Sequence, residues 1–158
     1  MFREVSRKNK QLQYEDCIDL LRCEKRGVLA VNGDDGYPYA MPMNHYYNPD
    51  DGCIYFHCGK TGHRLDAIRK SDKVSFCVYE KGSIEDGDWA YTVRSVVVFG
   101  RISETDDANI VSEICEAMCN KFTQDNEYIQ NEIKNYAKAT LILKLIPEHI
   151  QGKRIKES

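Results

Sequence analysis

A short basic segment with two glycines is the part of the sequence best suited to bind an anion. Gly59 and Gly62 bracket a bend after an apolar run, and the cationic side chains of Lys60, His63 and Arg64 lie within or just after it. Glycine lets the backbone approach a ligand closely, and a helix N-terminus offers free N–H groups and a partial positive charge. The segment therefore predicts a phosphate-binding bend, and the alternative is a capped helix with solvated charges.

The bend does not match the common nucleotide-binding motifs. It lacks the Gly-x4-Gly-Lys-Ser/Thr spacing of a P-loop and the Gly-x-Gly-x-x-Gly pattern that binds dinucleotides. Gly59 and Gly62 match the Gly-x-x-Gly of an RNA-binding KH loop, but that loop joins two helices, whereas this segment follows a predicted strand. Because the net charge is −3, no overall field attracts a polyanion, and we do not expect nucleic-acid binding.

Four potential zinc ligands lie within eleven positions, at Cys53, His57, Cys58 and His63. In a strand, Cys53 and His57 would share one face about 13 Å apart, since each residue adds about 3.3 Å. Cys58 would point to the opposite face, and zinc–ligand bonds are only about 2.0–2.3 Å long. The spacing therefore predicts no metal site.

A β-forming segment is interrupted by Pro42, which removes one hydrogen-bond donor from the ladder. This position favours an edge strand or a bulge, where a flat ligand could lie against the backbone. Met41 and Met43 would share a face with Tyr39 and His45, and their sulfur atoms are suited to contact an aromatic ring. Ordinary core packing is the alternative interpretation for both methionines.

Composition favours one domain without disulfide or metal support. Of the 158 residues, 42% are hydrophobic and 30% charged, and the seven cysteines lack the spacing of a secreted disulfide framework. Cys115 and Cys119 lie one helical turn apart beside an apolar stripe and are interpreted as core residues. Apolar runs reach only four residues, whereas a membrane-spanning helix needs about 20. Because the N-terminus also lacks the apolar core of a signal peptide, we expect a cytoplasmic protein.

Residues 1–12 are charged and aperiodic, and we expect a flexible N-terminal arm before a single domain at 13–158. Helices are predicted at 14–24, 63–70 and from Asp106 through Phe122, and strands at 27–31, 37–47, 53–58, 73–80, 89–103 and 139–146. Turns at 32–36 and 48–52 make the first three strands antiparallel neighbours, and Pro147 is expected to stop the last one. This order predicts a mainly β protein, a closed or partly closed antiparallel barrel of six or seven strands with flanking helices.

Four segments taken together resemble one known family. They are Gly36–Tyr39 running into Met41–Asn44, Ile54–His57 with Gly59 and Gly62–Ile68, Arg94–Arg101, and Pro147–Lys153. In this order, over about residues 14–155, the chain resembles the flavin-binding split-barrel proteins related to pyridoxamine 5′-phosphate oxidase, most closely the branch associated with 5-nitroimidazole resistance (NimA-like). The resemblance implies an FMN-binding split barrel that forms a homodimer, with one FMN in each of two clefts between the subunits.

The resemblance also implies which residues contact the flavin. They are Met41, Met43, Asn44, His57, Lys60, His63, Arg64, Ser95, Val96 and Lys153. The first three belong to a strand that would lie along the ring, and His57 would lie near the ribityl chain or the ring. The three cations of the bend would hold the phosphate, in agreement with the charge and glycine pattern. The serine and valine would reach the flavin from the partner subunit, and the last lysine would close the cleft.

The chain departs from true pyridoxamine phosphate oxidases near its end. Those enzymes carry an Arg-x-His substrate pair, whereas the nearest match here is Arg154-Ile155-Lys156, so vitamin B6 synthesis is not expected. The resembled branch implies an FMN-dependent oxidoreductase that passes electrons from NADH or NADPH to a small electron-poor acceptor, such as a nitro compound or a quinone. His57 is the first candidate for its catalytic histidine and His45 the second. The alternatives are a flavin- or heme-binding carrier or sensor, a bare structural dimer, and FAD in place of FMN.

Overall fold

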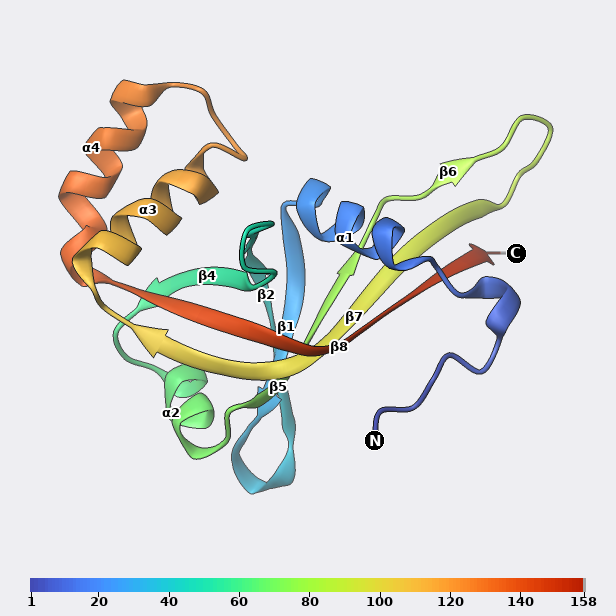
Figure 1. The fold of residues 1–158 in the computed structure, drawn as a ribbon, viewed down its shortest axis with the longest axis horizontal. Coiled ribbons are helices and arrows are strands. Elements are labelled where there is room, and N and C mark those ends of the chain that lie inside the picture. Colours follow the sequence, from blue (N-terminus) through green and yellow to red (C-terminus); the bar gives the residue numbers. More distant parts are fainter. Residues whose placement is uncertain (158) are drawn as a thin grey trace.

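Two long antiparallel strands form the spine of the fold. In the computed structural model, which describes residues 1–157, β7 (Tyr91–Thr105) pairs with β8 (Thr140–Glu157) along most of their length (Figure 1). Val96, Val98 and Ile102 are buried on one face of β7. Their alternation is the pattern of a strand with one face on a core, and β-branched side chains fit such a surface.

The other strands complete one antiparallel sheet in the order β2-β1-β5-β7-β8-β4-β3, with β6 paired to β7. Their bounds are Arg26–Asn32 for β1, Pro38–Asn44 for β2, Tyr46–Tyr47 for β3, Ile54–Gly59 for β4, Lys73–Tyr79 for β5 and Ser83–Ile84 for β6. The predicted fold class, a mainly β antiparallel split barrel with flanking helices, is confirmed. β2 lies at the end of this order, so the edge position predicted from Pro42 is confirmed as well.

The predicted strand 37–47 is two strands that pair with opposite ends of the sheet. β2 pairs with β1, whereas β3 pairs with β4. The chain therefore crosses between the two ends of the strand order at His45, which brings these ends together. Both predicted turn-linked pairs are antiparallel as expected, β1 with β2 and β3 with β4. The three predicted strands nevertheless do not lie side by side, because β4 takes β8 as its other partner and does not pair with β2.

Within residues 1–157, four α-helices flank the sheet: α1 (Tyr14–Cys23), α2 (His63–Lys70), α3 (Ala108–Cys119) and α4 (Asn126–Tyr136). The α2 bounds agree with the prediction, and Asp107 caps α3 by accepting hydrogen bonds from the backbone of Asn109 and Ile110. Figure 1 shows α3 and α4 as a hairpin at the end of the barrel where β7 ends and β8 begins. Within residues 1–157 no helix is long and apolar enough to cross a membrane.

Two apolar clusters hold these elements together. The larger one fills the barrel, where the rings of Phe56 and Phe76 meet edge to face with centroids 4.9 Å apart. The smaller one lies on the other face of β4, where Tyr55 and Ile142 pack against Met118 of α3. Because adjacent strand residues face opposite sides, β4 contributes to both clusters.

Pro147 does not stop β8, which continues for ten residues beyond it to Glu157. The register shifts between Phe99 and Gly100, and Glu148 is the extra residue of a β-bulge. Pro147 lies opposite Gly100, where a Cβ atom would be only 2.2 Å from the carbonyl oxygen of Ile146. A bulge opposite a glycine therefore accommodates the missing N–H group of the proline.

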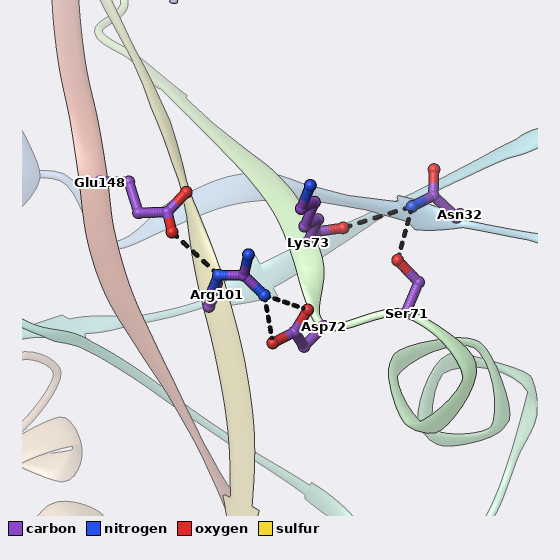
Figure 2. Close-up of polar contacts among 6 residues, drawn as sticks. All are labelled: Asn32, Ser71, Asp72, Lys73, Arg101 and Glu148. Carbon is purple, nitrogen blue, oxygen red and sulfur yellow. Dashed lines mark hydrogen bonds and ion pairs between the residues drawn. The ribbon is translucent and has the colours of Figure 1, made fainter. Parts of the chain in front are cut away.

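An arginine network connects this bulge to β5 and β7. Figure 2 shows that Arg101 donates from Nε to Glu148 at 2.9 Å and from Nη1 to both oxygens of Asp72 at 2.9 Å. Close by, the Asn32 amide donates to the Ser71 hydroxyl at 3.0 Å. The ion-paired groups are about half exposed, so each contact stabilises little by itself, but the shared guanidinium fixes the position of the bulge residue.

Residues 1–12 lie along β8. The Phe2 ring stacks on His149 with centroids 5.0 Å apart, Val5 is buried, and the Leu12 N–H group donates to the Gly152 carbonyl at 3.0 Å. The mobility expected for this arm, and the division of the chain at residue 13, stay predictions.

His45, at the crossing between β2 and β3, is fully buried and neutral. Its Nε2 atom lies 2.8 Å from the Leu21 carbonyl, so Nε2 carries the proton and donates, while Nδ1 has no partner within residues 1–157. Burial, followed by the charge of Lys121, lowers the pKa of His45 to about 4. The ammonium of Lys121 also donates to the carbonyl oxygens of Glu24 and His45 at 2.7 and 2.9 Å, which holds the crossing in place.

We predict that His45 makes the protein less stable in acid. The folded pKa lies below the ordinary value of 6.5, so protons bind the unfolded chain first, and stability falls as the pH drops from about 6.5 to about 4. This loss is about 3 kcal/mol, and His45→Leu removes it. Urea denaturation of both proteins at pH 7 and pH 4 gives the difference in their free energies of unfolding at each pH. This difference should shift in favour of the variant by about 3 kcal/mol at pH 4. An equal difference at both pH values would contradict the account.

Candidate functional site

The pairing of β4 with β8 decides which side chains reach the candidate site. The register runs from Ile54 opposite Leu145 to Gly59 opposite Thr140. Ile54 and Phe56 point into the barrel and are fully buried, so His57 projects from the other face. β4 then ends at Gly59, where the glycine bend (Gly59–Gly62) leads into α2.

The glycine bend is open to solvent and leads directly into a helix, as predicted. Gly62 has a φ of +124°, a backbone conformation that favours glycine. No atom lies within 4 Å of the place where a Cβ atom would stand on Gly59 or Gly62, so a ligand can approach the backbone there. No side chain caps α2, and the free N–H groups of its first turn are left for a ligand or for water. Leu65 and Ile68 are buried and anchor the helix.

A cavity of about 660 Å³, called the bend cavity here, lies beside the bend. It is lined by Arg26, Pro42, Met43, Asn44, His57, Cys58, Gly59, Arg64, Tyr136, Ala139 and Thr140. A smaller cavity of about 240 Å³ on the side of His63 shares Cys58, Gly59 and Arg64 with it. The glycine bend therefore forms the wall between two hollows.

Arg64 carries a hydrogen-bond donor that has no partner. Its Nε atom is buried, yet nothing within residues 1–157 accepts a hydrogen bond from it. An unsatisfied buried donor costs about 1–3 kcal/mol, and more when it is charged. Arg64 lines both cavities, so an anion bound at the bend would lie beside this side chain.

The other two cations of the bend have carboxylate neighbours. Lys60 Nζ lies 3.3 Å from Asp106, and His63 Nε2 lies 3.3 Å from Asp34. The His63 ring also stacks on Tyr39 with centroids 4.3 Å apart. These pairs are more than 40% exposed and therefore weak, so both cations can turn toward an anion at low cost.

The strand β2 contributes Pro42, Met43 and Asn44 to the lining of the bend cavity. Met41 and Met43 are 7% and 8% exposed and belong to the barrel core, so core packing is confirmed, and Met43 also lines the bend cavity. Contact of their sulfur atoms with a ring stays a prediction. Asn44 is half-buried beside the bend cavity, and its side-chain oxygen accepts a hydrogen bond from Arg26 Nε at 3.0 Å.

Ser95, Val96 and Lys153 lie away from both cavities. Ser95 and Lys153 are neighbours across β7 and β8, while the Val96 side chain is fully buried in the core of its own chain. A single chain therefore does not bring these three residues to the glycine bend. Their contribution from a second copy stays a prediction.

His57 is the one predicted catalytic candidate that reaches the bend cavity. The residue is more than a third exposed, and its ring nitrogen atoms form no hydrogen bond within residues 1–157. Partial burial, followed by the charge of Arg64, lowers the pKa of His57. The imidazole is therefore neutral at pH 7. His45 is fully buried, so its ring does not reach a ligand in the cavity.

The predicted divergence of the potential zinc ligands is observed. Cys53 and His57 lie on the outer face of β4, whereas Cys58 packs on the barrel core from the opposite face. Within residues 1–157, no three His, Cys, Asp or Glu side chains gather as a metal site would require.

The structure adds four lining residues that the sequence interpretation missed, which are Arg26, Tyr136, Ala139 and Thr140. Arg26 pairs with Asn44 across β1 and β2, a register that could have been extrapolated from the turn at 32–36. Tyr136 and Thr140 come from the end of α4 and the start of β8. α4 has a single buried residue, Ile129, and its sequence contains no motif that points to a functional site.

The family model described as pyridoxamine 5′-phosphate oxidase matches residues 13–154. The comparison with curated proteins gave no match. Among solved structures, a candidate 5-nitroimidazole antibiotic resistance protein from Bacteroides thetaiotaomicron has a TM-score of 0.77 and 14% identity, covering 93% of this chain and 87% of that one. The resemblance inferred from the four sequence segments is confirmed.

Two further similar structures carry cofactor names. An FAD-binding protein from Mesorhizobium loti has a TM-score of 0.64 and 22% identity, covering 92% of this chain and 97% of that one. An FAD- and heme-binding protein from Mycobacterium smegmatis has a TM-score of 0.72 and 19% identity, covering 94% of this chain and 74% of that one. At these identities the likeness shows a shared fold.

We predict that His57 titrates below its ordinary pKa and that Arg64 is part of the cause. Arg64→Gln removes a nearby positive charge, so the pKa of His57 should rise toward 6.5. Arg69→Gln, on the same helix but paired with Glu104, is the matched control and should leave His57 unchanged. NMR titration of the imidazole measures both. A wild-type pKa at or above 6.5, or equal shifts in the two variants, would rule out this coupling.

Proposed function

The chain belongs to the pyridoxamine 5′-phosphate oxidase family, and we propose that it is an FMN-dependent oxidoreductase. The observation that carries the proposal is the buried, unpartnered Nε–H group of Arg64 beside the open backbone of Gly59 and Gly62. The neighbouring cavity of about 660 Å³ has the size of a cofactor site, for which about 300–1,000 Å³ is typical. The residues present therefore fit a flavin with a terminal phosphate.

The phosphate would be held at the glycine bend. Arg64 would donate from Nε, and the first turn of α2 would add backbone N–H groups and its partial positive charge. Lys60 and His63 would contribute positive charge after giving up their weak contacts with Asp106 and Asp34. A charge-assisted hydrogen bond to phosphate is about twice as strong as a neutral one, and Arg64, unlike Lys60 and His63, gives up no carboxylate contact within residues 1–157 to form it.

The flavin ring would lie along the exposed edge of β2. Pro42 and Met43 line the cavity, and Pro42 has no N–H group that a ladder partner would require. A bound flavin accepts a hydride from a nicotinamide donor and passes electrons to an acceptor. Arg26 and Asn44, joined by their hydrogen bond, would stabilise negative charge that develops on the ring.

His57 is the residue to which we assign the catalytic role. It lines the bend cavity, is neutral at pH 7 and has no hydrogen-bond partner within residues 1–157. A neutral imidazole can donate one hydrogen bond and accept another, so it can orient an acceptor and transfer a proton to it.

We further propose a homodimer in the cytoplasm. Lys153 is exposed and Ser95 half-buried on the outer face of the long strand pair, so a second copy could bring them to the site without refolding. Val96 would contribute its backbone only, since its side chain is in the core. Free thiols at all seven cysteines suit a reducing compartment.

The segment near the C-terminus lacks the substrate-binding pair that true pyridoxamine phosphate oxidases carry. Arg154-Ile155-Lys156 lies within β8, paired with Thr92–Arg94 of β7, and supplies no Arg-x-His pair.

The second candidate function is a carrier or sensor that binds flavin or heme without turnover. It is favoured because the similar protein from Mycobacterium smegmatis is described as an FAD- and heme-binding protein.

We predict that Arg64→Ala weakens FMN binding by about 10- to 100-fold, the loss of about 1.5–3 kcal/mol from one charged hydrogen bond. The matched control is Arg69→Ala, because Arg69 lies on the same helix but binds Glu104. Fluorescence titration of flavin-free protein measures both dissociation constants. Unchanged affinity in Arg64→Ala, or an equal loss in both variants, would overturn the phosphate assignment.

The enzyme and carrier hypotheses differ in what a reductant does. We predict that NADH or NADPH bleaches the flavin absorbance of the loaded protein without oxygen, and that a small nitro compound or quinone restores it. A carrier would stay oxidised on the timescale of turnover. Mass analysis of the cofactor released on denaturation decides between FMN and FAD.

A further inference from the structure

A second cavity, of about 300 Å³, opens between the helical hairpin and the sheet. Called the helix-pair cavity here, it is lined by His57, Cys115, Met118, Cys119, Glu132, Ile133, Tyr136, Ala137 and Thr140. It exists because α3 covers the outer face of β4 only as far as Tyr55. His57, two residues further along that face, is left at the floor of a hollow.

The helix-pair cavity and the bend cavity share a wall. His57, Tyr136 and Thr140 line both of them. Thr140 is fixed there because its hydroxyl donates to the Tyr136 carbonyl at 2.9 Å. A ligand in the helix-pair cavity would therefore meet His57 from the side opposite a flavin in the bend cavity.

The lining of this cavity has a distinct chemical character. Met118, Ile133 and Ala137 are apolar, and the two thiols add soft, weakly polar surface. The lining includes no lysine or arginine, and Glu132 is its only ionisable carboxyl group. Within residues 1–157, Glu132 forms no ion pair. Its negative charge acts on the neighbouring thiol. Burial raises the pKa of Cys119 most, and the charge of Glu132 raises it further.

We propose that the helix-pair cavity is the acceptor site and that it selects small aromatic molecules that are uncharged or cationic. This inference rests on the proposed function and names the substrate class of the same site. The volume lies at the lower end for ligand sites, so a dinucleotide is too large. An anion would meet the uncompensated carboxylate of Glu132 in apolar surroundings, whereas a cation would pair with it. Phosphorylated and carboxylate substrates are therefore excluded.

Three probes of one shape and different charge test this selection. They are 4-nitrobenzamide, which is neutral, 4-nitrobenzoate, which is anionic, and 4-nitrobenzamidine, which is cationic. Calorimetric titration of wild-type protein, with and without FMN, should show the amide and amidine binding at least about tenfold more tightly than the benzoate, a difference of about 1.4 kcal/mol. Glu132→Gln should bring the benzoate within about threefold of the amide.

Two further variants separate charge selection from general effects. Glu127→Gln changes an exposed carboxyl group on the same helix and should keep the wild-type preference. Ala137→Phe fills the helix-pair cavity and should weaken all three probes while FMN affinity stays unchanged, since Ala137 lines only this cavity. Circular dichroism melting confirms that each variant folds.

The outcomes distinguish this inference from the proposed function. Wild-type protein that binds no FMN would refute the proposed function and with it the acceptor role, whatever the probes do. Normal FMN binding with equal affinity for the three probes, an unchanged preference in Glu132→Gln, or displacement of FMN by the probes would overturn the helix-pair cavity as the acceptor site.

Discussion

The pairing of β4 with β8 is the constraint on which the candidate site depends. Because the register is fixed from Ile54 to Gly59, Phe56 must enter the barrel core and His57 must project from the other face. The same register ends β4 at a glycine, so the chain turns into α2 with Arg64 at the edge of the cavity. A shift of one residue would exchange the two faces of β4 and dismantle both the core and the site.

The two cavities that share His57 differ in the charge of their lining residues. The bend cavity has cationic donors at Arg26 and Arg64, whereas the helix-pair cavity has a single carboxylate, Glu132. An anionic cofactor and a neutral or cationic acceptor would therefore sort into different cavities by charge. The shared neutral imidazole lies where a group must be to contact both ligands.

The parts of the structure that follow from local pattern could be predicted from the sequence. The glycine bend and α2 rest on neighbouring residues, and the Asp107 cap begins α3 close to the predicted place. Long-range choices could not be predicted. Nothing near His45 reveals that β3 takes a partner different from that of β2, because this depends on where β4 and β8 lie. The prediction that Pro147 ends the last strand was wrong for the same reason, since the bulge that accommodates the proline requires Gly100 on another strand.

The central claim is that Arg64 holds the phosphate of a flavin at the glycine bend. A crystal structure of the protein with FMN tests it most directly. The account predicts a phosphate oxygen within hydrogen-bond distance of Arg64 Nε, close to the backbone of Gly59 and Gly62, with the ring beside β2. A phosphate bound elsewhere, with the Arg64 Nε–H group still unpartnered, would contradict it.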